Sequence, residues 1–88
     1  MLRMLVQNTV QDYATWRAVF EENTHTFAPA GLSLEWVRRN PDNPNEVWFC
    51  LLVQDRAKAE SYLSDPAHAQ IGQRATVTAG QITYLTDD

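Results

Sequence analysis

The sequence predicts an α+β fold of the ferredoxin-like β-α-β-β-α-β type, in which helices cover one face of a four-stranded antiparallel sheet. Four segments are wholly apolar or alternate apolar and polar residues, as strands do: 2–9, 32–39, 47–53 and 77–86. Helical periodicity runs through the two long connections between them, residues 13–28 and 56–75. The sequence Ser64-Asp65-Pro66 interrupts the second connection, so we expect the second crossover helix to be split in two.

Length and composition limit the classes of protein to consider. The 88 residues suffice for one domain, residues 1–88, and 44% hydrophobic with 20% charged residues is typical of a globular chain. The net charge of −4 argues against a nucleic-acid partner, because neutralising phosphates requires a basic face. The N-terminal sequence MLRMLVQNTV is too short and too polar for a signal peptide or a membrane span. We therefore expect a cytoplasmic protein with no membrane partner.

The first strand and the first helix follow different periodicities. Apolar side chains share one side of residues 2–9, which indicates a strand with one apolar face. Asp12 is the expected N-cap of a helix from about Tyr13 to Ala28, and Gly31 is expected to adopt a left-handed conformation after it. Aromatic side chains recur on one helical face at steps of three, four and seven residues: Tyr13, Trp16, Phe20 and Phe27. This stripe is expected to face inward.

Two strands fold back on each other across the loop Asn40–Asn45, whose Asn, Asp and Pro residues suit a long hairpin turn. Simple alternation in the first arm predicts that Leu32, Leu34 and Trp36 share one face. The second arm, Val47–Val53, is apolar at every position, so both of its faces favour burial.

The helices of a single chain can cover only one face of this sheet. Leaving the other face in water would forgo several kcal/mol, at about 25 cal/mol per Å² of apolar surface. A second copy is the simplest cover, so we predict a homodimer packed sheet against sheet. The interface candidates are Trp36, Trp48, Cys50 and Leu52, although parity leaves open whether the two tryptophans face the partner or a pocket. Cys50 is the only cysteine, which excludes an intramolecular disulfide and favours a buried, inert thiol.

The last third of the chain completes the fold. Asp55 is the expected N-cap of a helix from Arg56 to Leu63, whose inward residues are predicted to be Ala59, Tyr62 and Leu63. Pro66 suits the first position of a third helix, where no amide proton is needed. The inward stripe of that helix is expected to consist of His68, Ile71 and Ala75, weakened by Gly72. The final strand, residues 77–86, alternates around Ile82, Tyr84 and Leu85.

Several of these pieces occur together in a known family. They are Asp12-Tyr13 with Trp16 and Phe20, then Gly31, then Arg39 followed by DNPNEV at 42–47, then Ser64-Asp65-Pro66. With them the chain resembles the dimeric α/β-barrel superfamily, in particular the small proteins grouped with antibiotic biosynthesis monooxygenases. The resemblance implies a ferredoxin-like protomer, a dimer whose two sheets form a barrel, and a pocket in each protomer between helices and sheet. Members include cofactor-independent monooxygenases acting on aromatic polyketides, haem-degrading enzymes and enzymes acting on muconolactone-like compounds, so the fold alone does not fix the chemistry.

The sequence also departs from this family. Close relatives tend to carry a His and, four residues later, an Arg on the first helix, and Asn23 and Phe27 occupy the matching positions here. The haem-degrading members use an Asn on the first strand with a Trp and a His on the later helices. Asn8 matches the first and Tyr62 lies near the second, but the His position falls near Gly72. Haem degradation is therefore not expected.

The candidate pocket residues are the aromatic stripe together with two polar side chains on inward faces: Tyr13, Trp16, Phe20, Asn23, Phe27 and His68. Asn23 needs a hydrogen-bond partner, which is either a backbone group, a water or a ligand. His68 is either a hydrogen-bonded structural histidine or a ligand contact. His25 lies off the aromatic stripe and is expected to be a solvated surface residue.

Other kinds of chemistry have little support in the sequence. Two histidines, one cysteine and no carboxylates at ligand spacing predict no metal site. No nucleophile stands beside a base in a recognisable motif, so no catalytic residue is assigned. Two hypotheses remain open. The first is a dimeric enzyme similar to the monooxygenases, acting without a bound cofactor on an aromatic or polyketide-like molecule. The second is a non-catalytic dimeric module that binds a metabolite.

Overall fold

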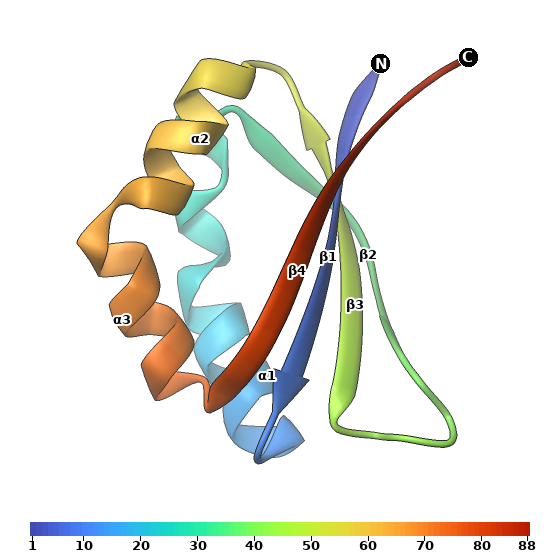
Figure 1. The fold of residues 1–88 in the computed structure, drawn as a ribbon. Coiled ribbons are helices and arrows are strands. Elements are labelled where there is room, and N and C mark those ends of the chain that lie inside the picture. The colour runs from blue at the N-terminus through green and yellow to red at the C-terminus, as the bar shows by residue number, and fades with distance from the viewer.

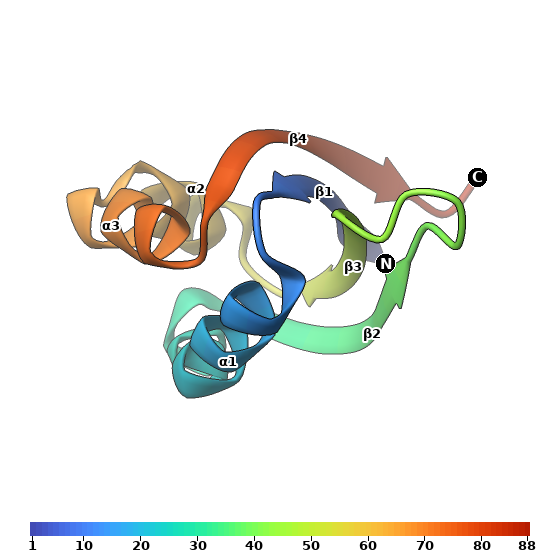
Figure 2. The same cartoon turned by 90° about the horizontal axis from the view of Figure 1, so that it is seen from below.

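Four antiparallel strands form one sheet in the computed structural model, which describes all residues from Met1 to Asp88. In spatial order the strands are β2 (Leu32–Arg39), β3 (Glu46–Val53), β1 (Leu2–Val10) and β4 (Val77–Thr86). Three helices lie on one face of this sheet (Figures 1 and 2): α1 (Tyr13–Asn23), α2 (Arg56–Ser64) and α3 (Pro66–Arg74). The chain therefore has the ferredoxin-like arrangement that the sequence predicts.

Aspartate side chains cap the N-termini of the three helices. The carboxylate of Asp12 accepts a hydrogen bond from the Ala14 amide at 3.1 Å, and that of Asp55 accepts one from the Lys58 amide at 3.1 Å. Asp65 adopts an extended conformation between α2 and α3 and caps α3. Because Pro66 follows directly as the first helical residue, the crossover splits at the predicted position.

The first helix is shorter than predicted, because it ends at Asn23 and not near Ala28. Two 3₁₀ turns, Thr24–Thr26 and Ala28–Ala30, continue the chain. The hydroxyl groups in the first turn donate to carbonyl oxygens three residues earlier, which favours the tighter geometry. Phe27 between the turns is still buried, with 9% of its surface exposed. Gly31 then takes the predicted left-handed conformation, with φ of 72°.

A bulge in β2 overturns the predicted alternation of that strand. Leu34 pairs with Leu51 and Trp36 pairs with Cys50, so Glu35 is an extra residue on this strand. Trp36 consequently lies on the face away from the helices. The prediction that it shares a face with Leu32 and Leu34 was wrong, since simple alternation does not register an inserted residue.

The hydrophobic core lies between the sheet and the helices. Trp16 is 2% exposed and stacks on Phe20, with ring centroids 4.7 Å apart. Phe20 in turn meets the edge of Phe49 from β3 at 5.1 Å. Met4 and Val47 on the central strands are fully buried below these rings. The inward-facing aromatic stripe thus anchors α1 to the sheet.

The other face of the sheet is covered by no helix (Figure 2). Because Val47, Phe49, Leu51 and Val53 of β3 belong to the core, the alternate positions of this strand project from the opposite face. Paired strands extend this outer face, which includes Trp36, Trp48, Cys50, Leu52, Leu5 and Leu85. All four interface candidates thus lie together on the side that the helices leave open.

Candidate functional site

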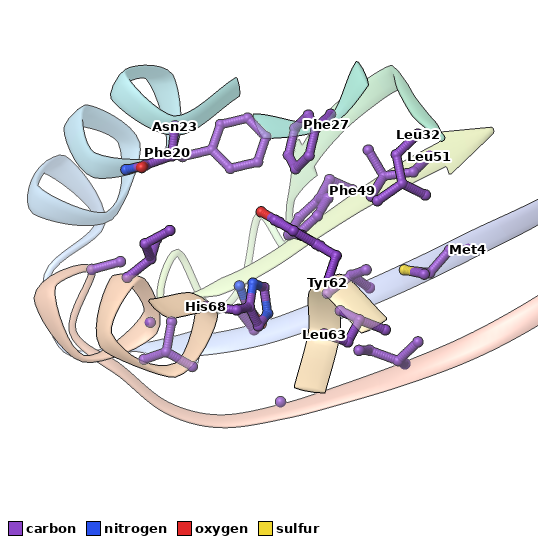
Figure 3. A pocket seen from close by; sticks show the side chains of 18 of the residues that line it. Met4, Phe20, Asn23, Phe27, Leu32, Phe49, Leu51, Tyr62, Leu63 and His68 are labelled. Carbon is purple, nitrogen blue, oxygen red and sulfur yellow. The ribbon is translucent and has the colours of Figure 1, made fainter. Parts of the chain in front are cut away.

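A cavity of about 400 Å³ lies between the three helices and the inner face of the sheet (Figure 3). Twenty residues line it, and 14 of these are hydrophobic. Strand β1 contributes Met4, Val6 and Asn8, while β3 contributes Phe49 and Leu51. The remaining walls come from α1, α2, α3, β4, Leu32 of β2 and Phe27 between the two 3₁₀ turns. A mostly apolar space of this size, with a few polar groups, has the character of a small-molecule site.

Five of the six candidate pocket residues line this cavity. Trp16, Phe20 and Asn23 come from α1, Phe27 lies between the two 3₁₀ turns, and His68 comes from α3. Tyr13 does not line it. Its ring packs against Trp16 at a centroid distance of 5.8 Å, and the Arg39 guanidinium lies 3.5 Å above its centroid. Tyr13 thus joins α1 to the end of β2 and supports the cavity wall from outside.

A chain of hydroxyl groups fixes the polar side of the cavity. The hydroxyl of Thr26 donates to the Asn23 carbonyl oxygen at 2.7 Å and lies 2.9 Å from the Tyr62 hydroxyl. Because Thr26 has only one proton to donate, Tyr62 must be the donor in the second bond. The Tyr62 oxygen therefore offers only its lone pairs to a bound molecule. The ring of Tyr62 meets Phe27 edge-on at 6.4 Å, which holds it in place.

Two asparagines also line the cavity, and each has hydrogen-bond partners within the protein. Asn23 donates from Nδ2 to the Val19 carbonyl oxygen at 2.8 Å. A backbone group is therefore the partner that this residue requires, and its amide oxygen and its second N–H are left for other contacts. The amide of Asn8 is assigned the orientation in which both of its ends form hydrogen bonds. In that orientation its oxygen accepts from the Trp16 indole Nε1 at 3.2 Å, and its nitrogen donates to the Gln7 carbonyl oxygen at 3.1 Å.

His68 is the histidine of the cavity. Its imidazole packs against Tyr62 with ring centroids 4.9 Å apart (Figure 3). Its Nδ1 atom is buried without a hydrogen-bond partner. Burial lowers the pKa of His68 from its usual value of 6.5, although the nearby Asp65 carboxylate acts in the opposite direction. The neutral imidazole, with one donor and one acceptor nitrogen, is therefore favoured near pH 7. His25, by contrast, is exposed on a 3₁₀ turn.

Several lining residues were not singled out as site candidates from the sequence. The sequence predicts that Tyr62 faces inward, and beyond that it relates Tyr62 and Asn8 only to haem chemistry, which is not expected here. Phe49 and Leu51 belong to the apolar run Val47–Val53, in which parity alone does not tell the inner face from the outer. Phe49 pairs with Val6 and Leu51 pairs with Met4, and these core partners place both residues on the inner face of the sheet.

Two further kinds of site were considered, a metal site and a membrane-spanning helix. No three His, Cys, Asp or Glu side chains come close enough together to hold a metal ion. No helix of the chain has the length and apolar character that crossing a bilayer requires.

Comparison with known proteins places the fold. No protein-family model matches the chain. No curated protein matches it in sequence either. A candidate antibiotic biosynthesis monooxygenase from Bordetella bronchiseptica has a similar structure, with a TM-score of 0.81 at 10% identity over 99% of this chain and 96% of that one. SnoaB, a cofactor-independent oxygenase from Streptomyces nogalater, gives 0.80 at 17% identity over 99% and 92% of the two chains.

An uncharacterised NIPSNAP domain protein from Burkholderia xenovorans shares the fold as well. Its TM-score is 0.74 at 13% identity, over 100% of this chain and 95% of that one. The structural neighbours are thus proteins of the antibiotic biosynthesis monooxygenase type with a ferredoxin-like fold. The resemblance inferred from the sequence is confirmed at the level of the fold, and at such low identities the fold carries no activity with it.

Proposed function

We propose that the protein binds an apolar aromatic molecule in the cavity between its helices and its sheet, and oxidises it with molecular oxygen without a bound cofactor. The cavity of about 400 Å³, mostly apolar and edged by a few polar atoms, is the observation that carries the proposal. The fold supports the oxygenase part, since SnoaB is described as a cofactor-independent oxygenase. Both parts remain separable by experiment.

The stability of the domain favours a ligand-binding role for this cavity. The space opens to solvent beside Ile82, which is 42% exposed, so apolar lining surface stays in water at a cost of about 25 cal/mol per Å². An 88-residue domain has a total stability of only about 5–15 kcal/mol. Larger side chains at the lining positions would recover that energy. A small domain that keeps the space open is therefore expected to use it for binding.

The chemistry needs little from the protein beyond binding and proton handling. A substrate in which a CH₂ group between aromatic rings is conjugated through them to a ketone loses one proton to form an electron-rich enolate. The enolate reduces O₂ and forms a C–O bond, and the resulting hydroperoxide loses water to leave a ketone. In sum, R₂CH₂ and O₂ give R₂C=O and H₂O, so the substrate supplies all the electrons. In the cavity, the neutral imidazole of His68 is the group suited to accept the proton.

Anthrone tests both parts of this proposal, because it enolises and its oxidation gives anthraquinone and water. Binding is measured by thermal shift, and turnover by oxygen uptake together with quinone absorbance. Ile71→Trp should fill the cavity and abolish both effects. The matched control is Leu34→Trp, because Leu34 does not line the cavity. Binding without oxygen uptake above the rate in buffer would refute the oxygenase and leave a metabolite-binding module. No binding by anthrone or related aromatic compounds would contradict the whole proposal.

We further propose that a second copy of the chain covers the outer face of the sheet. Large apolar side chains occupy this face, and Leu85 on it is 46% exposed. Burial raises the pKa of the Cys50 thiol, which is 4% exposed at the centre of the face and is therefore uncharged. Charged side chains of both signs lie among the apolar residues of this face, with Arg3 Nε 2.7 Å from the Glu35 carboxylate. A face with both signs suits the self-complementary contact of a two-fold dimer.

A further inference from the structure

Helix α3 differs from the other two helices because none of its residues is buried in the core. Helix α1 buries three of its side chains and α2 buries Ala59, whereas every residue of α3 keeps part of its surface exposed. Three residues of α3 are half-buried, namely His68, Ile71 and Gly72, and all three line the cavity. Helix α3 therefore lies mainly over the cavity and is supported by little of the packed core (Figure 3).

Both ends of α3 are attached to well-packed parts of the fold. The chain enters α3 from α2, where Ala59 is fully buried, and leaves it through Ala75, which is also buried. The carbonyl oxygen of Thr76 accepts from the Gln11 amide at 3.0 Å. The Thr76 hydroxyl accepts from the Asp12 amide at 3.1 Å and donates to the Asp12 carbonyl oxygen at 3.3 Å. These bonds hold Thr76 at a φ of 63°, an unfavourable value for a β-branched residue, and so fix the end of α3 to the start of α1.

Between these two ends, α3 is held by weak contacts. Arg74 lies 3.2 Å from the Glu22 carboxylate of α1, but both side chains are largely exposed, so this ion pair contributes little. The ring of His68 packs on Tyr62 with centroids 4.9 Å apart. Gly72 weakens the helix from within, because glycine is less favourable than alanine there. Neither its φ nor its surroundings require a glycine, since φ is not positive and an added Cβ atom would have no neighbour within 4 Å.

We propose that α3 is a strap, fixed at both ends, that opens locally to admit a molecule to the cavity and then closes over it. Opening unwinds α3 around Gly72 while the sheet, α1 and α2 stay folded. Because α3 and β4 both line the cavity, opening the strap enlarges the entrance beside Ile82. A bound molecule contacts the half-buried residues of α3 and holds the strap closed. This inference rests on the proposed binding function and adds the moving part that serves it.

Hydrogen exchange in the free protein tests the strap itself. The amides of residues 70–75 should exchange through local opening, so urea below the unfolding transition should leave their rates nearly unchanged. The amides of β1 and β3, which exchange through global unfolding, should accelerate as urea rises. Gly72→Ala should slow exchange in α3 by about four- to fivefold, because alanine favours the closed helix. Equal rates and equal urea dependence in α3 and both strands would overturn the strap. Unchanged α3 exchange in Gly72→Ala would overturn the role of Gly72.

Exchange in the presence of 2-naphthol, used as an aromatic probe, tests whether the strap closes over a bound molecule. At ten times the Kd, exchange of residues 70–75 should slow about tenfold, because the probe binds only the closed state. Binding itself is measured from the NMR signal of the Trp16 indole, since Trp16 lines the cavity. A shifted Trp16 signal with unchanged exchange in α3 would overturn closure over the ligand and leave the binding function intact. If neither changes, the binding function fails and the role of the strap in it fails as well, whatever exchange the free protein shows.

Discussion

Leu85 offers a direct way to test whether a second copy covers the outer face of the sheet. It pairs with Arg3 on the face away from the helices, and 46% of its surface is exposed in the protomer. Burying a whole leucine side chain contributes about 1.5–3 kcal/mol, so about half of that remains for the dimer contact. A two-fold dimer contains the substitution twice, which gives about 1.5–3 kcal/mol in total. Leu85→Ser should therefore weaken dimerisation by about 10- to 150-fold.

Sedimentation velocity over a concentration series measures this effect. Leu34→Ser is the matched control, because Leu34 is 40% exposed but pairs with the core residue Leu51 on the helix side. The control should keep a dimer constant within a few-fold of the original. A monomeric original chain at micromolar concentration would refute the reasoning. Equal weakening by both variants would show that general stability, and not the outer face, is responsible.

Three further predictions concern the cavity and its supports. Tyr62→Phe removes the bond to Thr26 and should lower the free energy of unfolding by about 0.5–1.5 kcal/mol in urea titrations; no loss would contradict the hydroxyl chain. Gly31→Ala should lose at least about 1–2 kcal/mol, since φ is 72° and Asp55 lies within 3.2 Å of the new Cβ; a neutral result in the same assay would contradict the strain. Because burial lowers the pKa of His68, the unfolded chain binds its proton at higher pH than the folded chain does, so stability should fall as pH drops below about 6.5. Urea titrations at several pH values should show a shallower fall in His68→Leu, and an identical pH dependence would refute the assignment.

Local chemistry made much of the fold predictable from the sequence. Asp12 and Asp55 each supply a carboxylate at the place where free helix amides need an acceptor. Pro66 could only start a helix, and this fixed the split in the second crossover. The aromatic stripe of α1 has a spacing that suits one helical face, so Trp16 and Phe20 were assigned correctly to the interior.

The remaining features depend on contacts between distant residues. Nothing local to Glu35 signals a bulge, because its pairing depends on how β2 fits against β3. The first helix ends at Asn23 because threonine hydroxyl groups compete for its last carbonyl oxygens, a balance that periodicity does not register. The partner of Tyr62 is 36 residues away in sequence, on Thr26, so the hydroxyl chain of the cavity appears only in three dimensions.

The three tryptophans provide the most direct test of the central proposal, which is that the cavity under the helices is the binding site. Trp16 lines the cavity, whereas Trp36 and Trp48 lie on the outer face of the sheet. Each indole N–H gives a separate signal in ¹⁵N-resolved NMR spectra, so one titration with 2-naphthol reports on both faces. The proposal predicts a saturable shift of the Trp16 signal while the other two stay in place. A stationary Trp16 signal, or shifts confined to Trp36 and Trp48, would contradict it.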